Sequence, residues 1–364
     1  MPLHDVGYRS WKGSLTSAWT RWWTISEVGV RAALASRWIR RIILASWFPV
    51  IYFGILFFAF ETMMETSFRD LARQTSGTEF LSEIQLSDEV SDAADQVEQI
   101  QMLRDRKDNA EYKVKSKLLA DNPMIRRLPN AEVLVASLES GDESQLRRTV
   151  WGYLLSTFLR YSQGMMTLMI VGLVVPPLIS RDVRSRAFLL YYSRPITRME
   201  YLIGKIAIPG FVLSLVTLVP GLVLYFLALM LSPDLSVIGD TWDLPFRVIA
   251  ATVVCIVPTC LIGLLFSALT QESRFASFAW FTVWGLGAVV WFGIYGSNSQ
   301  GGTIPFDSNW SLISIYSTIG RVQSWIFGLE MNVSQVVPSI TTLVGLSMFS
   351  FVLLYRRISA PIRV

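Results

Sequence analysis

Long apolar runs dominate the pattern of residues along the chain. Six segments lack Asp, Glu, Lys and Arg over the roughly 17–25 residues that a helix needs to cross the hydrocarbon layer of a membrane. They are Ile42–Phe60, Tyr161–Ser180, Ile206–Leu231, Val248–Thr270, Ala276–Tyr295 and Gln335–Tyr355. The pattern therefore predicts an all-α integral membrane protein with six transmembrane helices, and an even number of spans places both termini on the same side of the membrane.

Basic residues near these spans predict the orientation, because Lys and Arg are retained on the cytoplasmic side. Met1–Arg41 contains seven Lys or Arg and two acidic residues, and Arg181–Lys205 contains six and two. The turn between spans four and five carries Arg274, whereas the alternate loop Ser232–Arg247 has three Asp and one Arg. We expect a multi-pass protein of the inner (cytoplasmic) membrane with both termini in the cytoplasm.

The first 41 residues are too polar for a signal peptide and predict an amphipathic helix. Their apolar residues recur at every third or fourth position; they are Leu15, Ala18, Trp22, Ile25, Val28, Ala32, Ala35 and Ile39. Trp and Arg on such a helix are typical of a membrane interface. Residues 1–41 are thus predicted to be a cytoplasmic, interfacial segment that leads into the first span at residues 42–61. The alternative is a soluble helix packed against a partner.

The loop at residues 62–148 is polar and holds 17 of the 28 acidic residues. Long loops cross the membrane largely regardless of charge. Apolar residues at helical spacing predict a mainly helical extracytoplasmic domain inserted between spans one and two; they are Val90, Ala94, Val97, Ile100 and Leu103. We expect Asn130 to cap a further helix, Gly141 to interrupt it, and Ser144 to start a helix that runs into the second span.

Residues 149–364 hold spans two to six. The loop at residues 296–334 opens with Gly, Ser and Asn and then becomes rich in apolar and aromatic side chains, among them Trp310, Tyr316, Trp325 and Phe327. Such residues favour short interfacial or re-entrant helices at the outer face.

Composition excludes several classes of function. Only 16% of the residues are charged, against roughly 25% in soluble domains. One His and two Cys, which share an apolar run and are expected to be buried, exclude a multi-ligand zinc site and most His-dependent catalysis. The six spans contain no ionisable residue for a proton relay. The only Gly-Lys pair, Gly204-Lys205, lacks the other residues of a phosphate-binding loop. We expect a non-enzymatic membrane subunit without a catalytic, metal or cofactor site, and no nucleic-acid partner.

The loop at residues 181–205 is the most informative stretch. It starts with arginines and Asp182, continues into an apolar and aromatic patch, and returns to the membrane through a turn at Pro195. One interpretation is an Arg-rich loop anchored by phospholipid. The other is a short helix presented to a cytoplasmic partner, with aromatic side chains filling a groove and arginines fixing the orientation.

This loop resembles that of the permease (transmembrane) subunits of type-two ATP-binding-cassette (ABC) exporters. In those permeases an acidic residue and Gly-Thr follow the second span, and a stretch with Leu-Leu, Pro, Arg and Gly-Lys enters the third. The chain has Asp182 near the acidic position and then Leu189-Leu190, Pro195, Arg198 and Gly204-Lys205, but Arg186-Ala187 stands where the family usually has Gly-Thr. The six spans and the amphipathic entry helix fit the same family.

The resemblance implies that the loop is a coupling helix, which docks on a separate cytoplasmic ABC ATPase that binds ATP and Mg. The implied docking residues are Asp182, Arg184, Arg186, Phe188, Leu189, Tyr191, Tyr192, Pro195, Arg198, Gly204 and Lys205. It also implies a dimer with a second permease copy or a paralogue. The insertion at residues 62–148 is not shared by the compact exporters of the family.

Three functions remain open from the sequence. The apolar spans favour export of a hydrophobic or lipid-linked substrate, with prolines such as Pro176, Pro209 and Pro220 permitting bends. The insertion favours transmission of ATPase motion to an extracytoplasmic partner without transport. The third function is a membrane scaffold without an ATPase.

Overall fold

The chain is helical throughout the part that the structure describes. A computed structural model describes residues 20–75, 131–140, 143–187, 196–232, 237–299, 312–330 and 333–359, and these residues form helices and turns without a strand. The helices expected between residues 76 and 130 lie outside the described residues. An all-α fold is therefore confirmed for the described part.

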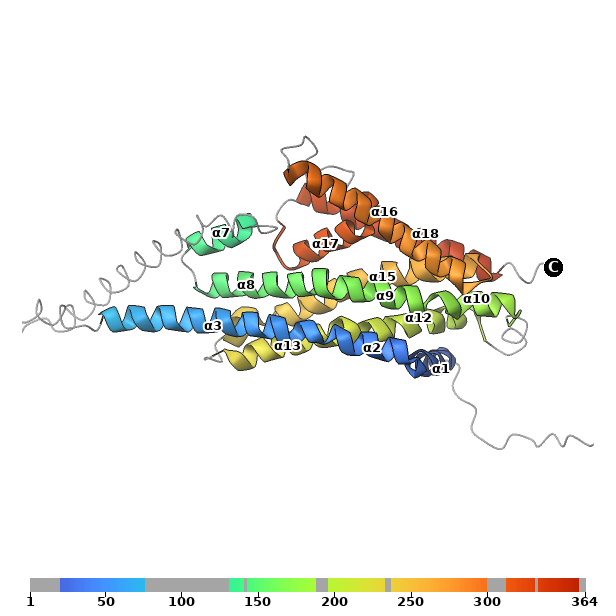
Figure 1. The fold of residues 1–364 in the computed structure, drawn as a ribbon, viewed down its shortest axis with the longest axis horizontal. Helices are drawn as coiled ribbons and strands as arrows, with labels where there is room; N and C mark the ends of the chain where they lie inside the picture. Colours follow the sequence, from blue (N-terminus) through green and yellow to red (C-terminus); the bar gives the residue numbers. More distant parts are fainter. Residues whose placement is uncertain are drawn as a thin grey trace, which may run out of the picture.

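The helices form one elongated bundle (Figure 1). In chain order they are α1 (Arg21–Ala35), α2 (Arg37–Ser46), α3 (Phe48–Thr75), α7 (Ala131–Ser140), α8 (Glu143–Thr157), a π-helical turn (Phe158–Ser162), α9 (Gln163–Val174), α10 (Pro176–Arg184), α12 (Arg198–Val216), α13 (Leu218–Leu231), α14 (Val237–Thr241), α15 (Leu244–Leu269), α16 (Ser273–Ser299), α17 (Ile315–Ile326) and α18 (Val333–Ser359). The end of the bundle at which α10 ends and α12 begins is called the loop end, and the opposite end, with α7 and α14, the far end.

Within the described residues, five helical stretches are long and apolar enough to cross a membrane. They are Arg37–Thr62, Ser144–Arg184, Arg198–Leu231, Val237–Leu269 and Val336–Ile358. Each overlaps one of the predicted spans, so a multi-pass membrane protein is confirmed. The remaining predicted span, Ala276–Tyr295, is helical in α16 but is not among the five.

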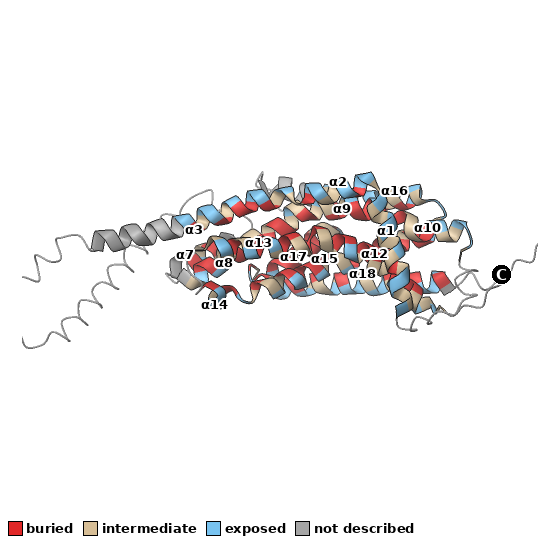
Figure 2. Ribbon diagram, turned by 90° about the horizontal axis from the view of Figure 1, so that it is seen from below, coloured by how far each residue is buried: buried red, intermediate tan, exposed pale blue. Residues whose placement is uncertain are grey.

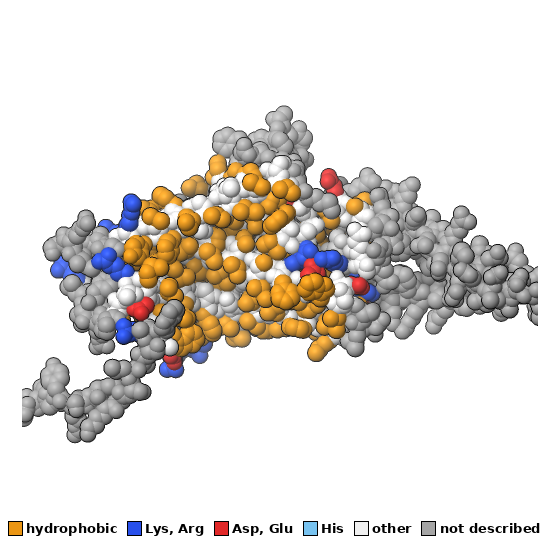
Figure 3. All heavy atoms as spheres, turned by 180° about the vertical axis from the view of Figure 1, so that it is seen from behind, with side chains coloured by type: hydrophobic (Ala, Val, Ile, Leu, Met, Phe, Trp, Pro, Cys, Tyr) orange, Lys and Arg blue, Asp and Glu red, His pale blue; other side chains and the backbone are white. Residues whose placement is uncertain are grey.

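The surface and the interior of the bundle fit a membrane environment. Figure 3 shows apolar side chains covering the middle of one face, with basic side chains toward one end and a mixed basic and acidic patch toward the other. Buried residues line the sides of the helices that face one another (Figure 2). Large apolar residues such as Phe58, Phe226 and Met230 are exposed, as expected where lipid takes the place of water.

The second span is the longest of the five described stretches. Residues Ser144–Arg184 run as one helix of 41 residues through α8, the π-helical turn, α9 and α10. At 1.5 Å per residue it is about 60 Å long, twice the hydrocarbon thickness of roughly 30 Å. Helix α8 begins at Glu143, next to the expected start at Ser144, whereas Gly141 lies outside the described residues. One helix thus joins the far end to the loop end.

Helix α3 also continues past its predicted span, through Thr75, and is tied to α8 by a buried acid. Glu61 is 2% exposed. It accepts a hydrogen bond of 2.8 Å from the Trp151 indole and one of 3.3 Å from Ser232, and lies 3.5 Å from the Arg147 guanidinium. These four residues are called the far-end polar cluster. The cluster stabilises the packing of α3, α8 and the end of α13 because it compensates a charge that is removed from water.

Helix α1 lies across the long axis of the bundle at the loop end (Figure 1). It is separated from α2 by Ser36, which has an extended conformation, and it packs against α12 of the same chain. A helix is therefore present in the described part of the predicted segment. Ile25, Ser26 and Gly29 face α12, whereas Val28, on the predicted apolar face, is 63% exposed.

Replacing Glu61 by Ala should destabilise the protein strongly, because Arg147 and Trp151 would lose a buried partner. We expect a cost of about 3 kcal/mol, measured as a lower midpoint of thermal unfolding in detergent. Glu27→Ala is the control, since it removes an exposed pair with Arg31 on one face of α1 and should cost about 0.5 kcal/mol or less. Equal midpoints for the two variants would contradict a stabilising role of Glu61.

Candidate functional site

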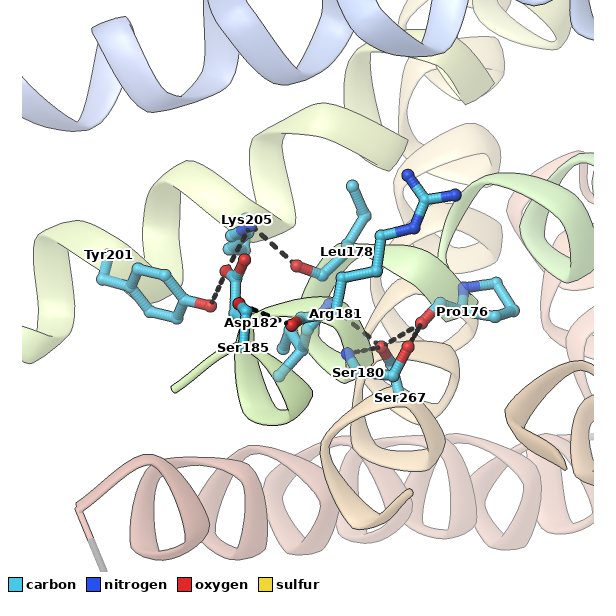
Figure 4. A network of polar contacts seen from close by, with 10 residues as sticks. Pro176, Leu178, Ser180, Arg181, Asp182, Ser185, Tyr201, Lys205 and Ser267 are labelled. Carbon is cyan, nitrogen blue, oxygen red and sulfur yellow. Dashed lines mark hydrogen bonds and ion pairs between the residues drawn. The ribbon is translucent and has the colours of Figure 1, made fainter. Parts of the chain in front are cut away.

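The loop end holds a compact group of polar side chains that connects α10 to α12 (Figure 4). The Lys205 ammonium lies 2.8 Å from the Asp182 carboxylate and donates to the Leu178 carbonyl at 2.7 Å. The Tyr201 hydroxyl donates to the same carboxylate oxygen at 2.7 Å. Asp182, Tyr201 and Lys205 are called the loop-end polar cluster. Because both charges are largely buried and paired, they fix the end of span two against the start of span three.

A serine of α15 holds the first turn of α10. Pro176 and Pro177 cannot donate backbone hydrogen bonds, and the helix is re-formed after them. The Ser267 hydroxyl accepts from the backbone N–H groups of Ile179 and Ser180 at 3.0 Å each and donates to the Pro176 carbonyl at 2.6 Å. The short helix that ends in the loop is therefore fixed to a third helix of the bundle.

Helix α10 ends in a turn with an unusual residue. The Ala187 N–H donates to the Asp182 carbonyl and the Arg186 N–H to the Val183 carbonyl, at 3.0 and 3.3 Å. This is the Schellman pattern, in which the residue after the helix has a left-handed conformation and is usually Gly. Arg186 takes that conformation with φ of 53°. The Arg186-Ala187 pair that departs from Gly-Thr thus lies where the backbone favours glycine.

The return into the membrane begins with a capping box. The Glu200 N–H donates to the Thr197 hydroxyl at 3.3 Å, and the Thr197 N–H donates to the Glu200 carboxylate at 2.7 Å. These contacts satisfy two N–H groups at the helix start. They fix the start of α12 at Arg198, so both ends of the loop have defined positions.

Helix α1 is seated on α12 at Gly204. The Ser26 hydroxyl donates to the Gly204 carbonyl at 3.2 Å and to the Trp22 carbonyl at 2.9 Å. A Cβ atom on Gly204 would lie 2.9 Å from the Cβ of Ile25 and 3.0 Å from the Trp22 carbonyl oxygen. Only glycine allows this approach. The entry helix and the loop are therefore parts of one packed unit.

The predicted site residues separate into three groups. Asp182, Gly204 and Lys205 make contacts inside the chain, while Arg184 and Arg186 are exposed and Arg198 is half-buried at the start of α12. The third group lies outside the described residues; it comprises Phe188, Leu189, Tyr191, Tyr192 and Pro195. The described residues thus form a rigid base from which the exposed arginines extend.

Sequence reasoning missed three contributors to this base: Tyr201, Ser267 and Ser26. Tyr201 could have been found, because it lies four residues before Lys205 and so shares its helix face. Ser267 and Ser26 carry no local signal, since each bonds to a helix that is distant in the sequence.

Comparison with known proteins identifies a family. A model of the family described as "ABC-2 family transporter protein" matches residues 23–357. No curated protein and no solved structure matches the chain. The match begins within α1, ends within α18 and includes both polar clusters.

Substituting Gly204 by Val should displace α1, because the new Cβ meets a branched carbon and a backbone oxygen that cannot move aside. We expect a loss of about 1–3 kcal/mol, measured as a lower thermal midpoint in detergent. The matched control is Gly210→Val on the same helix, since a Cβ there meets nothing within 4 Å. An equal loss for both variants would show that the seat of α1 is not the cause.

Proposed function

The chain belongs to the ABC-2 family of transporter proteins, and we propose that it is the permease subunit of an ABC transporter that a separate cytoplasmic ATPase drives. The loop at residues 181–205 is the surface on which the ATPase docks. ATP and Mg are bound by that partner, and this chain supplies no catalytic residue. The complex lies in the cytoplasmic membrane with the loop end and both termini inside, and α16 completes a set of six spans.

The loop-end polar cluster is the observation that carries the proposal. A push on the loop reaches α10 and α12 together, because Asp182 and Lys205 join the two helices through a buried ion pair. The same push reaches α15 through Ser267. A flexible loop would absorb the displacement, whereas one fixed at both ends passes it to three helices at once.

The exposed charges favour docking on a protein rather than anchoring by lipid alone. Arg184 and Arg186 extend from a turn of defined geometry. Guanidinium groups held in fixed positions recognise carboxylates in a defined direction. The aromatic residues Tyr191 and Tyr192 follow within one loop and are suited to fill a groove on the partner.

Export of a hydrophobic or lipid-linked substrate is the transport activity that the composition supports. The stretch between the two polar clusters is apolar in α9, α12 and α15, and no charged residue occurs between Ile206 and Leu231. Arg160 of the π-helical turn also lies between the clusters, but α9, α12 and α15 hold no acidic residue there, so a bare cation would find no compensating charge. A second copy of the chain, or a paralogue, supplies the other half of the pathway.

A second candidate function is transmission of ATPase motion to an extracytoplasmic partner through residues 62–148. The helical path Ser144–Arg184, which runs through the π-helical turn from the far end to the loop end, favours it. Because the far-end polar cluster ties α8 to α3, the two helices that enter the insertion are joined where they leave the bundle. A displacement at the loop end can therefore reach the insertion through one continuous element.

The docking surface is tested by a mild-detergent pull-down of the tagged full chain. Wild type should retain a soluble ATPase, and Tyr191→Glu/Tyr192→Glu should lose it, because two charges replace the aromatic anchors. Mass spectrometry and ATP hydrolysis of the eluate are the measurements. Arg274→Glu is the control, since Arg274 is exposed in the first turn of α16 at the same end. If wild type recovers no ATPase, the scaffold function replaces the proposal.

Replacing residues 76–130 by a Gly/Ser linker separates the two candidate functions. The replacement leaves α3, α7 and α8 intact, so the pull-down should still retain the ATPase. Export through the bundle predicts that substrate-stimulated ATP hydrolysis persists in proteoliposomes. Transmission to an outer partner predicts that cellular function is lost while basal ATP hydrolysis continues, and persistence of both would exclude it.

A further inference from the structure

The buried apolar residues of the bundle form two separate cores. The far-end core comprises residues of α3, α8, the π-helical turn, α13, α14 and the first turns of α15, together with Phe327 and Leu329. The loop-end core comprises residues of α2, α9, α10, α12, α16, α17, α18 and the rest of α15. Several helices pass from one core to the other, and each does so at a defined residue.

A buried polar residue stands at each of these crossing points. On α15, for example, Ala251 belongs to the far-end core, Val254 packs on the loop-end core, and Thr252 lies between them. The crossing residues are Ser46, Gln163, Thr217, Thr252 and Gln323, each 3% exposed or less. Together they are called the polar layer.

Contacts one helical turn away show that the layer lies at a single level of the bundle. A Cβ atom on Gly221 would contact Val248 at 3.0 Å and Leu159 at 3.7 Å. These three residues therefore share one level on α13, α15 and the π-helical turn. Thr217, Thr252 and Gln163 each lie four residues from one of them, in the direction of the loop end, so they share the next level.

Two hydrogen bonds extend the layer to the remaining helices. The Gln163 amide donates to the Ser46 carbonyl at 3.0 Å, which joins α9 to α2. The Gln323 amide donates to the carbonyl of Ala251, the neighbour of Thr252, at 3.1 Å, which joins α17 to α15.

Three spans are interrupted at this level. Helix α2 ends at Ser46 and α3 begins at Phe48, while α12 and α13 are separated by Thr217. Pro49 and Pro220 lack the N–H groups that would bond to the carbonyls four residues earlier. The hydroxyls of Ser46 and Thr217 also bond to the carbonyls of Ile43 and Leu213, an arrangement that bends helices.

The third interruption is the π-helical turn Phe158–Ser162. The Gln163 N–H donates to the Phe158 carbonyl, five residues back. The Tyr316 hydroxyl donates to the Arg160 carbonyl at 3.3 Å, so α17 supports the widened turn. Helix α15 crosses the level without a break.

The layer retains unused hydrogen-bonding capacity. Among the described residues, the Gln163 side-chain oxygen and the Thr252 hydroxyl are buried without a hydrogen-bond partner. Unpaired polar groups at a membrane interior are costly, so they favour any rearrangement or bound water that offers partners. A continuous, closely packed apolar core at this level would instead resist movement of one half of the bundle against the other.

We propose that the polar layer is a hinge plane across the bundle. The far-end core, with α3, α8 and α13, turns as one body against the loop-end core. Helix α15 is the pivot, because the other three spans that cross the layer are interrupted there and α15 is not. The inference rests on the proposed function only in taking the ATPase as the source of motion; the hinge itself is a property of this chain.

The first test uses the purified full chain in lipid nanodiscs, with Cys255 and Cys260 replaced by Ala. Spin labels at Met230→Cys and Phe211→Cys report across the layer, and labels at Met230→Cys and Phe246→Cys report within the far-end body; all three sites are exposed. Pulsed electron paramagnetic resonance should give a broad distance distribution across the layer and a narrow one within the body.

Restoring the helix should remove the movement. Pro49→Ala/Pro220→Ala returns the missing N–H groups, so the distribution across the layer should narrow to the width of the distribution within the body. Pro209→Ala is the matched control, because Pro209 lies inside the uninterrupted helix α12, away from the layer. The hinge would be overturned if the two distance distributions had equal widths in wild type, or if the distribution across the layer did not narrow in Pro49→Ala/Pro220→Ala.

The second test uses the complex recovered with the ATPase. Addition of ATP and Mg should shift the distance across the layer in wild type, and Pro49→Ala/Pro220→Ala should retain the ATPase but lose this shift. A shift between two copies of the chain, with none across the layer, would overturn the hinge in favour of rigid helices that rock. If no ATPase is recovered, the proposed function fails, and the nanodisc measurement alone decides the hinge.

Discussion

The absence of water in the hydrocarbon layer is the constraint on which this structure depends. Each backbone N–H and carbonyl at that depth needs a partner within the protein, and an α-helix supplies these partners within a single segment. The same constraint favours pairing of the buried charges: Asp182 is paired with Lys205 at one end and Glu61 with Arg147 at the other. Between the two pairs the bundle is largely apolar, and Arg160 lies there over the ring of Tyr316.

The two polar clusters differ in which helices they join. The loop-end polar cluster connects neighbours in the chain, α10 and α12, across the loop that separates them. The far-end polar cluster connects α3 and α8, which are separated by the long insertion. Both ends of the bundle are thus tied by polar contacts, and the polar layer lies between them.

The features that follow from residues close in sequence could be predicted. Apolar runs gave the spans, a three-to-four-residue period gave the helix that is seated on Gly204, and Ser144 marked the start of the long helix. Contacts between distant helices could not be predicted, because nothing local indicates that Ser267 meets Pro176 or that Glu61 meets Trp151. The polar layer could not be predicted for the same reason, since a residue such as Thr252 is recognised as part of it only once the neighbouring helices are in place.

The π-helical turn determines how α8 is rotated about the helix axis relative to α9. Such a turn holds one residue more than an α-helical path would, so converting it to α-helix would rotate α8 by about 100° and shift it by about 1.5 Å relative to α9. The Trp151 bond to Glu61 and the Arg148 pair with Asp243 each exist at one angle of that rotation. These contacts therefore fix the rotation of α8 about its own axis relative to α9.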